Sequence, residues 1–87
     1  MKETIRLIVE GIPKGSIFDS HTVISLLIER YSDIYLANYS HTSTELYHGY
    51  IAQCIAELNS GIVRQLGQSW SRNIHGEYSK CAYWERI

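Results

Sequence analysis

Apolar residues near the start of the chain follow the spacing of an amphipathic helix. They recur at intervals of three and four residues, at Ile5, Ile8, Val9 and Ile12, which is the pattern of a helix with one buried face. Ile5, Leu7 and Val9 also alternate, so a strand is the rival interpretation. Pro13 ends the element in either case, because the residue before a proline avoids helical backbone angles.

A second helix is predicted from Ser20 onward. Asp19 and Ser20 are residue types that cap helix N-termini, and they follow a short apolar pair, Ile17 and Phe18. The next apolar residues form one stripe at helical spacing, made of Val23, Ile24, Leu27, Ile28 and Tyr31. The segment 31–41 has apolar residues but is too short for a long helix or strand, and we interpret it as a short helical turn and a loop.

A third helix is predicted from Thr42 to Leu58. The run Thr42-Ser43-Thr44-Glu45 fits a capping box, and the residues expected to face the core are Tyr47, Ile51, Cys54, Ile55 and Leu58. The opposite face is short and almost uncharged, with Glu45, His48, Gly49, Ala52, Gln53 and Ala56. An idle solvated helix normally carries Lys and Glu, so this smooth face predicts that something lies close against it.

Two strands are predicted at the end of the chain. Residues 62–66 follow a glycine that closes the third helix, and residues 81–87 alternate in the manner of a strand. Between them lies a polar, aromatic-bearing loop, residues 67–80, "GQSWSRNIHGEYSK". Two strands joined by such a loop make a hairpin, and the loop is its tip.

Length and composition indicate one small globular domain covering residues 1–87. The chain is 45% hydrophobic and 11% aromatic and has a single proline, which is unlike a disordered chain. It has no run of about 20 apolar residues and no secretory signal pattern. We therefore expect a cytoplasmic protein without a membrane segment, in which Cys54 and Cys81 are free thiols.

Charge is uneven along the chain although the net charge is only −1. Residues 1–59 carry four basic and seven acidic side chains, a net charge of −3. Residues 60–87 carry four basic and two acidic side chains, a net charge of +2. The positive character therefore coincides with the predicted hairpin, and local patches of this kind attract phosphate.

The order of these elements resembles that of winged helix-turn-helix domains over nearly the whole chain. That order is a helix, a short strand, two helices and a hairpin with an extended tip. The resemblance implies an α+β fold with a three-helix body and a C-terminal two-stranded β-hairpin, the wing, at about residues 62–87. It also implies that helix 42–58 docks in the major groove of duplex DNA and that the 67–80 wing follows the backbone or the minor groove.

The resemblance also assigns candidate nucleic-acid-binding residues. On the helix these are Ser43, Thr44, His48, Gly49, Ala52 and Gln53, and on or near the wing they are Arg64, Ser69, Ser71, Arg72, Asn73 and Lys80. The connection 32–41 is longer than the usual tight turn, which leaves room for an extra short helix. The docking helix has no Lys or Arg, so the predicted affinity for DNA is modest unless a homodimer doubles the contacts.

We therefore predict a small DNA-binding regulator of transcription or replication, of bacterial or phage type. The alternative is a phage or mobile-element protein that binds and inhibits a host protein complex, similar to anti-CRISPR or antirestriction proteins. The smooth helix face suits such a protein-protein interaction, and it equally suits a homodimer contact. The position of the hairpin cations favours the first hypothesis.

Metal and catalytic sites are not predicted. On a continuous helix His41 and His48 would stand roughly 10 Å apart, too far to share one ion, and Cys54 and Cys81 lack any paired ligand spacing. Glu45 and His48 could form a base and its orienting partner. No phosphate loop, nucleophile motif or carboxylate pair accompanies them, so we expect no cofactor, no metal and no enzyme activity.

Overall fold

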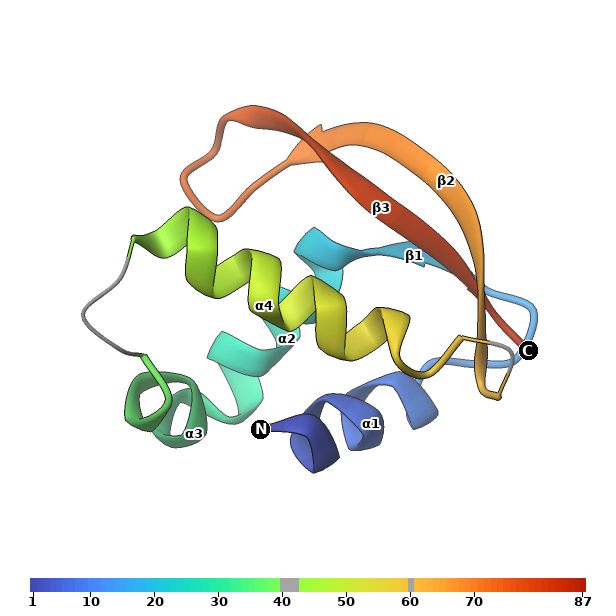
Figure 1. The fold of residues 1–87 in the computed structure, drawn as a ribbon, viewed down its shortest axis with the longest axis horizontal. Coiled ribbons are helices and arrows are strands. Elements are labelled where there is room, and N and C mark those ends of the chain that lie inside the picture. The colour runs from blue at the N-terminus through green and yellow to red at the C-terminus, as the bar shows by residue number, and fades with distance from the viewer. Residues whose placement is uncertain (40–42, 60) are drawn as a thin grey trace.

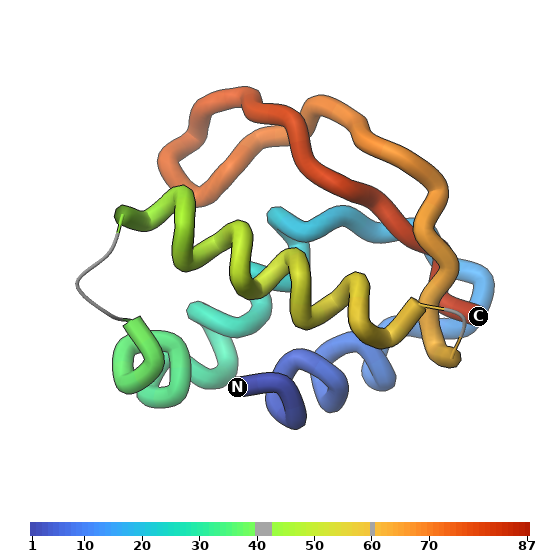
Figure 2. Tube along the Cα trace, in the orientation of Figure 1, coloured from blue at the N-terminus to red at the C-terminus, as the bar shows by residue number. Residues whose placement is uncertain are grey.

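The computed structural model describes residues 1–39, 43–59 and 61–87. In this part of the chain, four helices and one three-stranded antiparallel sheet form an α+β architecture. The elements are, in order, α1 (Lys2–Glu10), β1 (Ile17–Asp19), α2 (Ser20–Arg30), α3 (Ser32–Ala37), α4 (Thr44–Ala56), β2 (Val63–Arg72) and β3 (Tyr78–Arg86). The sheet lies along one side of the molecule, and β2 and β3 arch over α4 (Figure 1 and Figure 2).

Side-chain caps fix the start of two helices. Asp19 accepts a hydrogen bond from the backbone N–H of Thr22 at 2.8 Å, which confirms the predicted start of α2. Ser43 accepts from the backbone N–H of Leu46 at 3.2 Å and caps α4. The helix predicted for residues 42–58 therefore spans Thr44–Ala56, and Thr42, where the capping box was expected to begin, lies outside the described residues.

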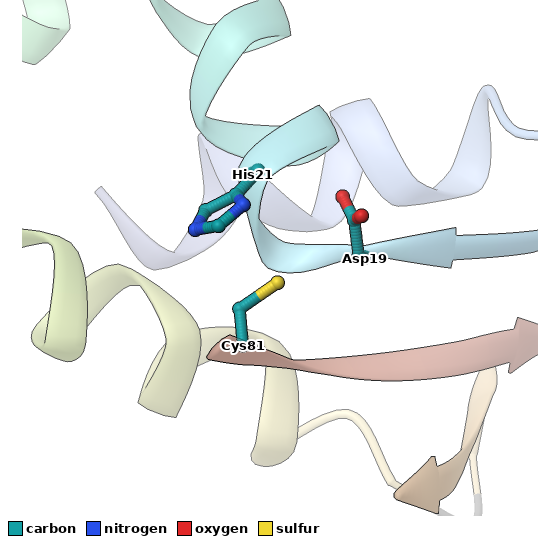
Figure 3. Close-up of side chains that lie close together, drawn as sticks. All are labelled: Asp19, His21 and Cys81. Atoms are coloured by element: carbon teal, nitrogen blue, oxygen red, sulfur yellow. The ribbon is translucent and has the colours of Figure 1, made fainter. Parts of the chain in front are cut away.

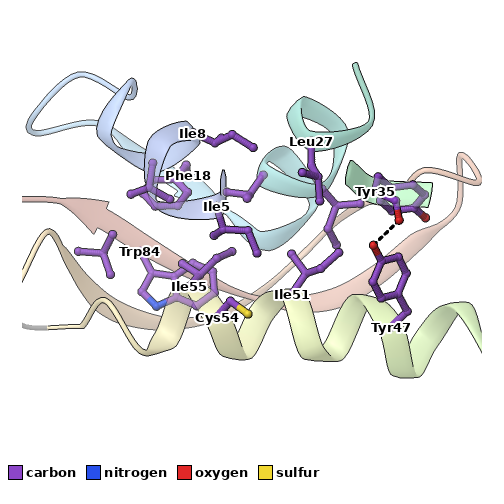
Figure 4. Close-up of a cluster of buried hydrophobic side chains, with 14 residues drawn as sticks. Ile5, Ile8, Phe18, Leu27, Tyr35, Tyr47, Ile51, Cys54, Ile55 and Trp84 are labelled. Atoms are coloured by element: carbon purple, nitrogen blue, oxygen red, sulfur yellow. Dashed lines mark hydrogen bonds between the residues drawn. The ribbon is translucent and has the colours of Figure 1, made fainter. Parts of the chain in front are cut away.

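The predicted three-helix body omits one helix. Residues 32–37, interpreted as a helical turn and part of a loop, form the six-residue helix α3. Its Tyr35 packs on Tyr47 of α4 with ring centroids 5.1 Å apart, and the Tyr47 hydroxyl donates to the Tyr35 carbonyl oxygen (Figure 4). This tertiary contact stabilises a helix too short to be stable alone.

One cluster of buried side chains joins the helices to the sheet (Figure 4). Its members are Ile5, Ile8, Val9, Phe18, Val23, Ile24, Leu27, Tyr35, Tyr47, Ile51, Cys54, Ile55, Val63 and Trp84. The helical interpretation of residues 2–10 is thus confirmed, because the residues at helical spacing are the ones that are buried. No helix in the described part of the chain combines the length and apolar character needed to cross a bilayer.

The predicted C-terminal pair of strands is present as β2 and β3, but the prediction that these two strands form the whole sheet is wrong, because the sheet has three strands in the order β1-β3-β2. The short strand β1 pairs antiparallel with β3, and Phe18 lies opposite Trp84 with their rings stacked at 6.0 Å. Three residues are too few to show the alternation that reveals a strand. The pairing joins residues more than sixty positions apart, which sequence periodicity does not report.

The hairpin formed by β2 and β3 is also longer than predicted. The strands expected at 62–66 and 81–87 extend through most of the supposed loop, so that Arg72 still pairs with Tyr78. Only residues 73–77 form the turn. The prediction missed these pairs because exposed side chains occur on both sides of the outer part of β2, which removes the apolar-polar alternation that marks a half-buried strand.

Candidate functional site

Two of the four cations in the C-terminal third have partners inside the protein. Arg64 forms an ion pair with Glu85 on the neighbouring strand. Arg86 is buried, with Nε 3.2 Å from the carbonyl oxygen of Val9 and Nη1 3.3 Å from that of Ile62. The positive charge that the sequence assigns to this third of the chain is therefore only partly available to a ligand.

The other two cations alternate with two aromatic side chains on one face of the hairpin. In the β2–β3 ladder Trp70 lies opposite Lys80, and Arg72 lies opposite Tyr78, two residues farther along. Partners in an antiparallel ladder share a face, as do residues two apart on one strand. All four side chains are exposed, Trp70 by 66% and Tyr78 by 67%. We call these four residues the aromatic-cation face.

Strand twist explains why this face is exposed. Trp84 lies on the same side of β3 as Lys80 by alternation, yet Trp84 belongs to the core and Lys80 is exposed. A bulge at Gly67, whose φ is +145°, shifts the register of β2 between these positions. Bulges increase the right-handed twist of a ribbon. One side of the hairpin therefore covers the core at the base of the hairpin, and the same side faces solvent near the tip.

Asn73 holds the turn of the hairpin together. Its side-chain oxygen accepts hydrogen bonds from the backbone N–H groups of His75 at 2.9 Å and Glu77 at 3.2 Å, and its side-chain nitrogen donates to Ser79 Oγ at 3.2 Å. The predicted phosphate contact by Asn73 would compete with these bonds. Gly76, at φ +78°, allows the turn to close.

A cleft of about 540 Å³ separates the hairpin from the N-terminal half of α4. On the helix side it is lined by four residues of the smooth face, which are Glu45, His48, Gly49 and Ala52, together with Thr44. On the hairpin side the polar residues are Gln68, Asn73, His75, Ser79 and Lys80. The chain's own hairpin therefore faces part of the smooth face across this cleft, and that something lies close against the face stays a prediction.

The structure places the predicted residues of α4 in different surroundings. Ser43 caps the helix, and Thr44 Oγ1 is 2.9 Å from the hydroxyl of Tyr39. Gln53 is exposed and does not line the cleft, whereas Ala52 does. The side chains expected to contact bases therefore do not form one open surface. On the hairpin Ser69 is exposed and Ser71 is half-buried.

His48 is held at the wall of the cleft by Tyr35, whose hydroxyl lies 2.9 Å from His48 Nε2. Burial lowers the pKa of His48, and the nearby imidazoles of His75 and His21 lower it further, while Glu45 opposes the shift. His48 therefore resists protonation and is poorly suited to bind phosphate as a cation.

A group of polar side chains that the sequence did not single out lies where α2 meets the hairpin. Donor atoms of Asp19, His21 and Cys81 all lie within 4.8 Å of one another (Figure 3). Ser71 Oγ lies 2.5 Å from His21 Nδ1 and 3.6 Å from Cys81 Sγ, and Ser79 Oγ lies 3.2 Å from His21 Nε2. We call these five residues the polar junction.

The signal for the polar junction was weak. Asp19 and His21 are two positions apart, but the sequence pattern indicates only a helix cap at Asp19 and gives Cys81 no ligand partner at close spacing. Once β1 pairs with β3, Asp19 lies opposite Tyr83, which brings Cys81 to the start of α2. The register of the sheet was needed to find the group.

Comparisons with protein-family models, with curated proteins and with solved structures find no match for this chain. The functional inference therefore depends on the geometry of the hairpin, the cleft and the polar junction.

Proposed function

We propose that this chain is a nucleic-acid-binding protein of the winged helix-turn-helix type, in which the β2–β3 hairpin is the wing. The order of the elements and the sheet order β1-β3-β2 support this class, since they are compatible with a winged helix that carries one additional short helix. The proposed role is regulation of transcription or replication by a small bacterial or phage protein.

The aromatic-cation face carries the proposal. Arg72 and Lys80 supply the charge that neutralises phosphate, and their neighbours Trp70 and Tyr78 supply flat apolar surfaces. The guanidinium carbon of Arg72 lies 5.5 Å from the centre of the Tyr78 ring, a cation-π contact that orients the guanidinium. Alternating cations and exposed aromatic rings suit a ligand with phosphates along a backbone and bases that can stack.

Duplex DNA is the first ligand to test, and the hairpin is expected to dominate its binding. No described residue of α4 is Lys or Arg, so the helix supplies few contacts with phosphate or guanine. Two hairpin cations release few counterions. We therefore expect modest affinity that decreases with salt, with the hairpin lying along the backbone or in the minor groove and the exposed N-terminal end of α4 beside it.

A direct titration tests this function. A fluorescently labelled duplex and a labelled single strand of matched length would each be titrated with the native protein at low salt, and anisotropy would report binding. Saturable binding that weakens as salt is added supports the proposal. Absence of binding to both ligands contradicts it, and tighter binding to the single strand would assign the aromatic rings to unpaired bases.

A second candidate, binding and inhibition of a host protein complex, is favoured by one specific observation. Trp70 and Tyr78 are exposed aromatic side chains on one face of the hairpin, and Ile74 in its turn is also exposed. Trp, Tyr and Arg are the residues that most often dominate protein interfaces. Such binding would persist at salt concentrations that remove phosphate contacts. Two results together would favour this candidate. The native protein would capture a partner at high salt that Trp70→Ala does not capture, and the native protein would not bind DNA at low salt.

A homodimer is the remaining partner hypothesis. The smooth face of α4 was one surface that suited a homodimer contact, and four of its six residues line the cleft under the hairpin. Sedimentation of the native protein over a range of concentrations tests the dimer directly.

A further inference from the structure

We propose that Asp19, His21 and Cys81 bind a zinc ion that ties the start of α2 to the hairpin. The three side chains come from the end of β1, the first turn of α2 and the middle of β3 (Figure 3). Each offers one donor atom within 4.8 Å of the other two. The inference concerns a site apart from the aromatic-cation face and does not depend on the proposed function.

The donor set selects the metal. A thiolate, an imidazole and a carboxylate are the three ligand types that zinc accepts in proteins, and a thiolate disfavours magnesium and calcium. Zn²⁺ with one thiolate and one carboxylate has no net charge, so the ion adds no uncompensated charge to a half-buried site. Three protein ligands leave one position of a tetrahedron open.

The surrounding hydrogen bonds orient the proposed ligands. Ser71 Oγ contacts both His21 Nδ1 and Cys81 Sγ, which identifies Nδ1 as the ring nitrogen on the cysteine side. The other nitrogen, Nε2, is left to donate to Ser79 Oγ, 3.2 Å away. A second partner of this kind is the usual arrangement for a histidine that binds a metal, because it fixes the tautomer and the ring plane.

Asp19 is also prepared as a ligand. One carboxylate oxygen accepts from the backbone N–H and the hydroxyl of Thr22, at 2.8 and 2.9 Å, which fixes the orientation of the group.

Zinc binding requires the three ligand atoms to move closer together and the Ser71 hydroxyl between them to be accommodated. Bond lengths of about 2.0–2.3 Å place tetrahedral zinc ligands roughly 3.3–3.6 Å apart. The three ligand atoms lie within 4.8 Å of one another, so they must approach by at most about 1.5 Å. The Ser71 hydroxyl lies between the ligands and would either fill the open position or rotate away. A hollow of about 380 Å³ beside the junction, lined in part by Asp19, His21, Ser71 and Arg72, gives the ion a route of entry.

Cobalt substitution tests the site with the metal alone. Reduced native protein would be titrated with Co²⁺, which reports a bound thiolate by a ligand-to-metal charge-transfer band and tetrahedral geometry by strong visible bands. We expect both signals to saturate at one ion per chain and to disappear when Zn²⁺ is added. Absence of a thiolate band in the native protein overturns the proposal.

Matched variants assign the ligands. Cys81→Ser and Asp19→Asn should each lose or strongly weaken the Co²⁺ signal, and both keep the local structure, since serine retains a hydrogen-bonding atom and asparagine caps helices as well as aspartate. Cys54→Ser removes the other free thiol, which is buried on α4, and should leave the spectrum unchanged. A thiolate band that survives Cys81→Ser, or is lost in Cys54→Ser, places the metal elsewhere and contradicts the assignment. Circular dichroism of each variant confirms that it is folded.

Discussion

Trp70 lies directly opposite Lys80 in the β2–β3 ladder, and both side chains are exposed. Exposure of a large apolar ring to water is unfavourable, so a partner that covers the ring with a flat apolar surface and offers negative charge to the neighbouring cation gains free energy from both. Under the proposed function, this pair makes the hairpin, rather than the smooth face of α4, the expected binding surface.

The first prediction concerns Trp70. Trp70→Ala should weaken nucleic-acid binding by about 1–3 kcal/mol, the usual loss when a base-stacking side chain is removed. It should change the free energy of unfolding by only about 0.2–1 kcal/mol, the range for one cross-strand pair. Anisotropy titrations and urea unfolding measure the two effects. Gln65→Ala, at another exposed position of β2 that is not a candidate nucleic-acid contact, is the control, and equal loss of binding in both variants would count against stacking.

The second prediction concerns the bulge. Gly67 has φ +145°, an angle that other residues rarely adopt, and an added Cβ would lie 3.5 Å from the Tyr83 ring. Gly67→Ala should therefore destabilise the protein by about 1–3 kcal/mol. Gly49 lies inside α4 with open space around it, so Gly49→Ala should stabilise the protein by about 0.5–1 kcal/mol. Urea unfolding of the two variants should give opposite signs, and equal signs would contradict this account of the bulge.

The third prediction compares two arginines on the hairpin. Arg86→Met should destabilise the fold by about 1–3 kcal/mol, because it removes the hydrogen bonds from the buried guanidinium to the carbonyl oxygens of Val9 and Ile62. These two oxygens keep their backbone donors, the N–H groups of Ile12 and Ile87. Arg64→Met should cost no more than about 1 kcal/mol, since its ion pair with Glu85 is at the surface. The comparison requires only urea denaturation of each variant. Similar costs would show that burial of Arg86 is not what holds the base of the hairpin.

The fourth prediction concerns the pH dependence of stability. His48 has a pKa below its ordinary value of 6.5 in the folded protein, because of burial and then of the neighbouring imidazoles. The unfolded chain therefore binds a proton first as the pH falls, and the stabilising contribution of neutral His48 is lost from about pH 6.5 down to the folded pKa. Above that window His48 contributes no pH dependence.

A pair of unfolding curves checks this sign. Between about pH 7.5 and about pH 5.5 the native protein should lose more stability than His48→Gln. The variant also loses the contact with Tyr35. The cost of that loss does not change with protonation at position 48, because glutamine does not titrate. An equal or larger loss in the variant would show that His48 is not the group responsible.

The helices α1, α2 and α4 were predictable from this sequence because each buries one stripe at helical spacing, whereas α3 was interpreted only as a helical turn and part of a loop. The stripes through Ile5 and Ile8, and through Val23 and Leu27, are the residues that the structure buries. The ends of the hairpin strands were not predictable in this way. Gln68 and Ser69 are both exposed although they are neighbours in β2, so the strand there has no buried face to produce alternation.

The candidate site was harder to predict than the fold, because it depends on pairing between distant strands. Arg64 and Arg72 look equivalent in the sequence, yet only the register shows that Arg64 lies opposite Glu85 while Arg72 lies opposite Tyr78. The register likewise brings Cys81 to His21. Sequence spacing alone cannot supply such contacts, since they join segments up to sixty residues apart.

The most direct test of the central claim is the salt dependence of DNA binding when the charge of the aromatic-cation face is removed. Arg72→Gln with Lys80→Gln should weaken binding to any duplex and reduce the slope of log affinity against log salt by about 2, roughly one unit for each lost phosphate contact. The control is Lys14→Gln with Arg30→Gln, which removes the same charge from exposed positions outside the hairpin and should leave the slope unchanged. An unaltered slope in the hairpin variant, or the same change in both, would contradict the claim that this face binds nucleic acid.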